Sequence, residues 1–188
     1  MNETRQVVKS VIPAHGMDLF RMVRYETKVP GFVIRSVDEG DVDLILSFIM
    51  KLAEYEGLLP EVSATKADIY DSIIAKRQAE VIIGELDGSP VAFALFFHNY
   101  STFLGKANLY LEDLYVNEEQ RGKGIGRTMF ACLAKIAVER NCGRLDWWCL
   151  DSNETSIAFY RRMGARPMSD WTVYRIDGET LNDLARSL

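Results

Sequence analysis

The chain has 188 residues, of which 48% are hydrophobic and 26% charged, proportions typical of a soluble globular protein. Its net charge of −5 argues against a nucleic-acid partner held by phosphate contacts, and no apolar run is long enough to predict a membrane helix. Three cysteines without metal-ligand spacing predict reduced thiols, no metal site and a cytoplasmic protein.

Residues 1–30 differ in pattern from the rest and are predicted to be an N-terminal extension before one domain over 31–188. Pro30-Gly31 marks the boundary. No basic region precedes an apolar core, so no signal peptide is expected. Four apolar residues favour a short amphipathic turn within the extension: Val7, Val8, Val11 and Ile12.

The domain is predicted to begin with a strand and two helices. The β-rich run 32–37 predicts the strand, and apolar residues at helical spacing predict a helix over 41–56, ended by Gly57. The run Thr65-Lys-Ala-Asp68 has the pattern of a capping box, which predicts the start of a second helix that continues through Ala75.

Three consecutive strands follow, over 81–86, 91–97 and 107–116. Asp87-Gly88 between the first two is typical of a tight hairpin turn, so these strands are expected to be antiparallel.

A glycine-rich loop at 121–126 then leads into an amphipathic helix over 126–140. Glycine lets the backbone approach a ligand closely, and the free N–H groups of a helix start attract anions, so the loop predicts a phosphate or pyrophosphate site. The Walker pattern is absent, and the dinucleotide fingerprint fails because Arg127 occupies the place of its third glycine. An ordinary tight turn with basic residues in solvent is the alternative interpretation.

The remaining pattern completes a mixed α/β sheet with helices on both faces. A strand over 144–150 is expected to be parallel to the preceding one, because a helix connects the two. A helix over 154–163, a strand over 172–176 and a short helix over 179–185 follow.

The loop pattern Gln/Arg-x-x-Gly-x-Gly/Ala, matched by Arg121, Gly124 and Gly126, resembles that of the GCN5-related N-acetyltransferases, the GNAT superfamily. The resemblance implies the GNAT fold, a mixed and mostly antiparallel sheet in which two neighbouring parallel strands splay apart, with acetyl-CoA as cofactor. The loop would hold the pyrophosphate, and the third strand of the meander would offer backbone groups to the pantetheine arm. Asn153 would also bind the cofactor, although capping of the next helix is an equal alternative. The cofactor-binding residues implied in this way are Leu114, Tyr115, Val116, Arg121, Gly122, Lys123, Gly124, Ile125, Gly126, Arg127, Asn153 and Tyr160.

Acetyl transfer to an amine requires a neutral amine and a thiolate that can leave. Glu112 is predicted to be the catalytic base, although a solvent-exposed position at a sheet end is an alternative. Because successive residues of a regular strand point to opposite faces, Glu112 and Asp113 face one site together only if a bulge intervenes, as it often does in the family. Tyr160, in the family pattern Asn-x6-Tyr-x3-Gly, is implied to be the acid that protonates the thiolate, with a core position as the alternative.

Three stretches, 53–56, 110–116 and 121–126, resemble the spermidine/spermine and thialysine branch of the superfamily. This resemblance implies a homodimer whose acceptor site includes Tyr55, Glu56, Glu112, Asp113 and Trp171. Ser101 and Phe103 stand where the polyamine enzymes carry an Asp and a Trp, which weakens recognition of a second ammonium. The predicted function is therefore N-acetylation of a primary amine in a small molecule, a diamine, polyamine or lysine analogue. A protein or peptide N-acetyltransferase and a non-catalytic CoA-binding module are the alternatives.

Overall fold

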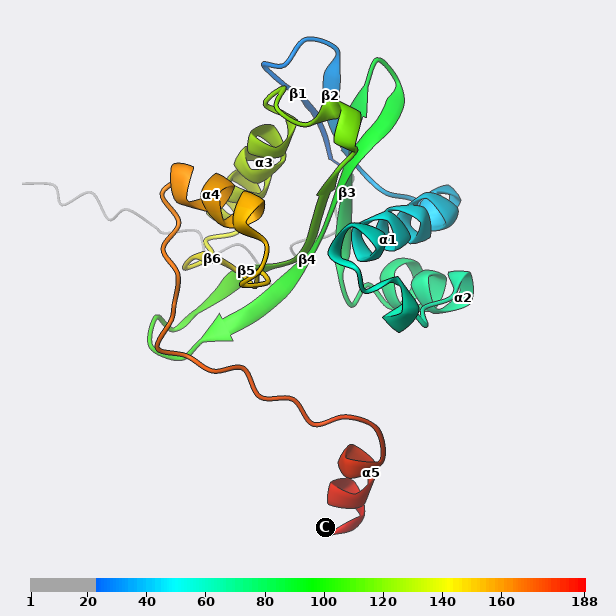
Figure 1. Cartoon of the computed structure of the whole chain (residues 1–188), viewed down its shortest axis with the longest axis vertical. Coiled ribbons are helices and arrows are strands. Elements are labelled where there is room, and N and C mark those ends of the chain that lie inside the picture. Colours follow the sequence, from blue (N-terminus) through cyan, green and yellow to red (C-terminus); the bar gives the residue numbers. More distant parts are fainter. Residues whose placement is uncertain (1–22) are drawn as a thin grey trace, which may run out of the picture. The chain divides into compact units, whose positions relative to one another are not determined.

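The computed structural model describes residues 23–188, shown in Figure 1, so the turn predicted at Val7–Ile12 lies outside the described residues. The chain divides into two compact units, the first ending at Trp148 and the second covering Cys149–Leu188.

The first unit contains a six-stranded sheet with the strand order β1-β2-β3-β4-β5-β6. All neighbours are antiparallel except β5 and β6, which are parallel, so the predicted mixed sheet is confirmed. The first strand lies within the range predicted to be an extension and pairs with the second. The strands are β1 (Arg24–Glu26), β2 (Phe32–Ser36), β3 (Glu80–Leu86), β4 (Ser89–Ser101), β5 (Lys106–Val116) and β6 (Leu145–Trp147).

Helices cover both faces of this sheet, as Figure 1 shows. One face carries α1 (Val42–Glu56) and α2 (Lys66–Ile69), and the other carries α3 (Ile125–Glu139). On the first face Phe48 of α1 stacks on Phe93 of β4, with ring centroids 5.2 Å apart. On the second face Met129 of α3 is fully buried and packs close to Gly84 of β3. The core therefore has two layers, one on each side of the sheet.

Local sequence signals set several boundaries as predicted. Asp87 and Gly88 both have positive φ, 50° and 78°, as a type I′ hairpin turn requires. Gly57 ends α1 in the left-handed conformation with a φ of 74°. The Thr65 hydroxyl accepts the Asp68 N–H at 3.3 Å, and the Asp68 carboxylate accepts the Thr65 N–H at 2.9 Å, which confirms the capping box. After four α-helical residues the second helix becomes a π-helix over Tyr70–Ala75, with the Lys76 N–H bonded to the Asp71 carbonyl at 2.9 Å.

The second unit contains α4 (Glu154–Arg162) and α5 (Gly178–Arg186). The prediction of a strand over 172–176 is wrong. These residues form no strand, and the side chains of Val173, Tyr174 and Ile176 are exposed. The run has the composition of a strand, but a strand needs ladder hydrogen bonds to a neighbour. The described residues of this unit provide no neighbouring strand.

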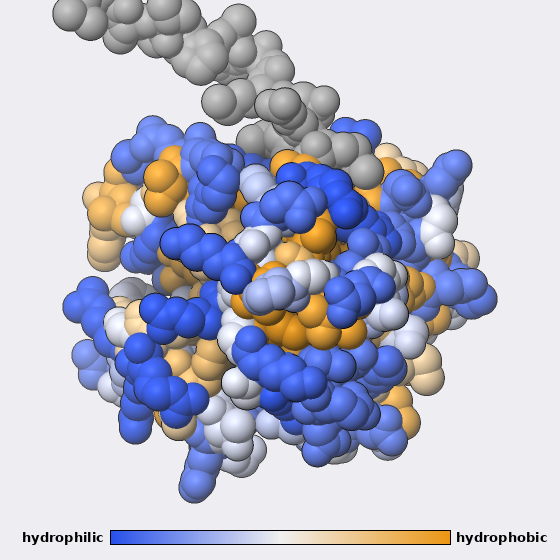
Figure 2. All heavy atoms as spheres, turned by 90° about the horizontal axis from the view of Figure 1, so that it is seen from above, coloured by the Kyte–Doolittle hydropathy of each residue, from blue (hydrophilic) through white to orange (hydrophobic). Residues whose placement is uncertain are grey.

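Hydrophilic side chains cover most of the molecular face in Figure 2, with smaller apolar areas between them. Such a surface agrees with the charged fraction of 26%.

Candidate active site

Strand β5 extends beyond its parallel partner β6, which ends at Trp147 although the sequence predicted a strand over 144–150. Pairing of β5 with β6 covers only Leu109 with Leu145, Tyr110 with Asp146 and Leu111 with Trp147. Beyond Leu111, β5 continues to Val116, paired with β4 on its other side. The backbone of Leu114, Tyr115 and Val116 therefore has one edge without a partner strand in the described chain. A peptide-like ligand can add to such an edge through main-chain hydrogen bonds.

The glycine-rich loop lies between the end of β5 and the start of α3. Gly122 and Gly124 have φ values of 76° and 84°, a backbone conformation that other residues adopt only with strain. A Cβ added at Gly122 would meet no atom within 4 Å, and one at Gly124 would meet only Val29, at 3.9 Å. The loop backbone is therefore open to a ligand, which fits the predicted pyrophosphate site.

The start of α3 is suited to an anion. Gly124 occupies the N-cap position, where it cannot provide a side-chain cap, and the first turn carries no acidic residue. The first N–H groups of a helix need acceptors and carry partial positive charge. Ile125 is buried and anchors the helix, so its backbone N–H, and not its side chain, is the group offered to a ligand. Lys123 and Arg127 are exposed beside it.

Arg121 has a role that the sequence did not predict. Its guanidinium lies over the ring of Tyr55 at 4.4 Å and near that of Tyr115 at 5.5 Å, distances typical of cation–π contacts. Its Nε donates to the Val116 carbonyl at 3.0 Å. Arg121 therefore connects the start of the loop to β5 and to the end of α1.

The bulge expected in β5 is present at Glu112. Leu95 of β4 pairs with Asp113, whereas the next residue, Phe96, pairs with Leu111, so Glu112 is the extra residue. Tyr115, two residues after Asp113, lies beside Phe48 with ring centroids 6.2 Å apart, which places this part of β5 against α1. Asp113 consequently faces the α1 side of the sheet, while Glu112 is exposed.

Three carboxylates lie within electrostatic reach of one another at this point. Burial, together with the negative charges of Glu112 and Glu56, raises the pKa of Asp113 to about 7. Burial also raises the pKa of Glu56, at the end of α1. The structure thus brings together Tyr55, Glu56, Glu112 and Asp113, from two elements far apart in sequence. A proton acceptor with a pKa near neutrality is suited to base catalysis at pH 7, and the pKa of Asp113 lies in that range.

The other predicted site residues belong to the second unit. Asn153 caps α4, because its Oδ1 accepts the Ser156 N–H at 3.1 Å, so the capping alternative is confirmed. Tyr160 lies on α4 with its ring 5.4 Å from that of Phe159. Trp171 is 72% exposed. Their roles toward cofactor and acceptor stay predictions.

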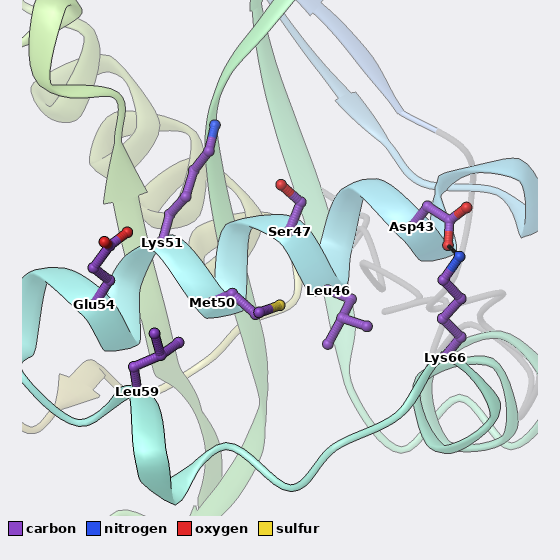
Figure 3. Close-up of a pocket in the computed structure, with 8 residues that line it drawn as sticks. All are labelled: Asp43, Leu46, Ser47, Met50, Lys51, Glu54, Leu59 and Lys66. Atoms are coloured by element: carbon purple, nitrogen blue, oxygen red, sulfur yellow. Dashed lines mark ion pairs between the residues drawn. The ribbon is translucent and has the colours of Figure 1, made fainter.

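A groove of about 530 Å³ lies elsewhere in the first unit, along the outer side of α1 (Figure 3). Its apolar lining comes from Leu46, Met50 and Leu59, and an ion pair of 2.5 Å between Lys66 and Asp43 lies at one end. None of the predicted site residues lines it.

Within residues 23–188, no set of three or more His, Cys, Asp or Glu side chains is placed to bind a metal ion. No helix in the same range is long and apolar enough to cross a membrane.

Comparison with known proteins agrees with this geometry. Residues 49–165 match the acetyltransferase (GNAT) family. A thialysine N-epsilon-acetyltransferase from Bos taurus is 35% identical over 167 residues, which cover 81% of this chain and 96% of that protein. A human spermidine/spermine N(1)-acetyltransferase-like protein 1 is 32% identical over 171 residues, 85% of this chain and 24% of that protein. A solved integron cassette protein from V. cholerae superposes with a TM-score of 0.69 at 30% identity, over 83% of this chain and 98% of that one. The chain therefore belongs to the acetyltransferase (GNAT) family and is an N-acetyltransferase.

Proposed function

We propose that this protein transfers an acetyl group from acetyl-CoA to the primary amine of a small molecule, a diamine, polyamine or lysine analogue, by direct attack of the amine. The observation that carries this proposal is the position of Asp113, whose pKa is raised to about 7, on the part of β5 that continues beyond its parallel partner β6. Similarity to a thialysine acetyltransferase and to a spermidine/spermine acetyltransferase-like protein supports the acceptor class.

The first task of the chain is to hold the cofactor, which supplies an acetyl thioester when bound. The backbone N–H groups of residues 122–126 and the start of α3 would accept the diphosphate. The backbone of Leu114–Val116 would pair with the pantetheine amides along the edge left open by β6. Arg121 would contribute by fixing the start of the loop to β5.

The second task is to remove a proton from the amine. An alkylamine has a pKa of about 10.4, so roughly one molecule in a thousand is neutral at pH 7, a deficit of about 4–5 kcal/mol. Asp113, assisted by Glu112, would accept this proton directly or through water, which frees the nitrogen lone pair to form the new C–N bond. Glu56 adds negative charge beside Asp113 and would attract the ammonium form into the site.

The third task is to protonate the thiolate when the C–S bond breaks. Tyr160 is the residue we assign to this step, by its place in the family pattern. A thiol has an ordinary pKa of about 8.5, so the thiolate is a fair leaving group and the help needed from Tyr160 is modest.

We further propose that the protein works in the cytoplasm as a homodimer and that Trp171 and Tyr55 contribute to acceptor binding. Size-exclusion chromatography with light scattering would measure the molar mass in solution, which distinguishes a homodimer from a monomer. A monomer that retains full activity would refute it.

A panel of amines and peptides tested with acetyl-CoA, with release of free thiol as the signal, tests the function. Turnover with diamines or lysine analogues and none with peptides would support the proposal. Turnover restricted to peptides would support a protein acetyltransferase instead. CoA binding without turnover for any acceptor would indicate a binding module.

A further inference from the structure

Trp148 directly follows β6, at the point where the parallel pairing of β5 ends. The last pair is Leu111 with Trp147, so the next residues along the chain are Glu112 in β5 and Trp148 just after β6. The ring of Trp147 packs on Phe130 of α3, with centroids 5.0 Å apart. The ring of Trp148 packs on Tyr110 instead, which places it on the opposite side of the sheet, the side that Asp113 faces.

Trp148 continues a row of aromatic rings across three strands. Phe97 of β4 and Tyr110 of β5 have centroids 5.0 Å apart, and Tyr110 and Trp148 have centroids 5.9 Å apart in an edge-to-face arrangement. Tyr110 is 8% exposed, whereas Trp148 remains 59% exposed. Packing on Tyr110 therefore leaves more than half of the surface of Trp148 available to a ligand.

Acidic groups flank this aromatic row. Asp146, paired with Tyr110 across the two strands, and Glu112 both place negative charge near the Tyr110 hydroxyl and, after burial, raise its pKa, which reaches about 12. Asp146 also binds Arg144, with Nε 2.7 Å from Oδ2, so part of its charge is already compensated. An exposed indole beside carboxylates is suited to a cationic group attached to a short apolar chain.

We propose that Trp148, supported by Tyr110 and Asp146, forms the subsite for a second cationic group of the acceptor, distant from the amine that is acetylated. This inference rests on the proposed function and names the acceptor class as amines that carry a second ammonium. Asp113 follows Tyr110 by three positions on β5, roughly 10 Å at strand spacing, so a chain of several methylenes connects the two positions.

Two sources of the second ammonium fit this chemistry, a diamine and the α-amino group of a lysine-like amino acid. Three acceptors of matched length separate them: n-pentylamine, 1,5-diaminopentane and lysine. In the wild type we expect KM for the two dicationic acceptors to be about tenfold below that for n-pentylamine, as one cation–π contact would give. Arg144→Ala should raise KM for lysine if the lysine α-carboxylate binds Arg144, and should lower KM for 1,5-diaminopentane, because it frees the charge of Asp146.

Trp148→Ala should raise KM for 1,5-diaminopentane and lysine about tenfold, with less than a twofold change for n-pentylamine and for acetyl-CoA. Trp148→Phe, which keeps a ring, should retain most of the affinity and provides a folded comparison. Tyr70→Leu, an exposed aromatic on the π-helix, is the matched control and should change none of these values. Equal KM for all three acceptors in the wild type, or an equal loss for all three in Trp148→Ala, would overturn the subsite alone. Absence of turnover with every amine would overturn the proposed function and the subsite with it.

Discussion

Replacing Asp113 with Asn should lower activity and raise stability at the same time. The carboxyl is held in a buried position beside Glu112 and Glu56, and its pKa rises from the ordinary 3.8 to about 7. In the folded protein the carboxyl stays protonated up to about pH 7, whereas in the unfolded chain it ionises near pH 4. Stability from this group is therefore present below about pH 4 and is lost as the pH rises toward 7.

The size of the effect follows from the shift in pKa. A rise from 3.8 to about 7 corresponds to as much as about 4 kcal/mol of stability lost above pH 7. The amide of Asn carries no charge at any pH, so D113N should melt several degrees above the wild type at pH 8. The difference should narrow as the pH falls toward 4. Thermal melts followed by circular dichroism at pH 4, 6 and 8 measure this dependence.

The same variant tests catalysis. Base catalysis contributes about 100- to 10,000-fold, so kcat of D113N should fall by at least a hundredfold. In the wild type, the pH profile of kcat/KM should have an inflection near pH 7 as Asp113 loses its proton, and this inflection should be absent in D113N, where only the amine itself titrates. Glu112→Gln is the matched comparison for D113N, because it removes the neighbouring carboxylate that the sequence predicted to be the base. Retained activity with an unchanged pH profile in D113N would refute the role of Asp113 as the base. A fall in the melting temperature of D113N at pH 8 would refute the raised pKa of Asp113 in the folded protein.

Three further substitutions test other parts of the site and fold. Tyr160→Phe should reduce kcat at least tenfold with CoA affinity nearly unchanged, measured by turnover and calorimetric titration; an unchanged kcat would remove the acid role. Gly124→Val should abolish CoA binding, because its φ of 84° disfavours valine and the branched side chain would occupy the ligand's place; Gly105→Val, at a φ of 62° in open space, is the control that should bind normally. Thr65→Ala should cost about 1 kcal/mol of unfolding free energy in urea, since it removes the cap of α2; a cost below about 0.3 kcal/mol would contradict the capping box.

Local chemistry explains which elements could be predicted. The hairpin at Asp87-Gly88, the end of α1 at Gly57 and the capping box at Thr65 each depend on a few neighbouring residues, and all three are confirmed. The parallel pairing of β5 with β6 was also predictable, because a helix connects the two strands.

Features that depend on distant contacts were missed. Arg121 stacks on Tyr55, which lies 66 positions away in the sequence, and no local pattern predicts this contact. The raised pKa of Asp113 comes from burial, from Glu112 and from Glu56 on another element, so the sequence could not predict it; the prediction that Glu112 is the base stays a prediction. The prediction of a strand over 172–176 was wrong for the same reason. A strand-like composition is a local property of the sequence, whereas the strand with which it must pair comes from elsewhere in the chain.

A crystal structure of the protein with bound CoA tests the central claim most directly. We expect the diphosphate to lie on the backbone N–H groups of residues 122–126 and the pantetheine arm to lie along Leu114–Val116, beside Asp113. A complex in which CoA binds elsewhere and the loop contacts no phosphate would contradict it.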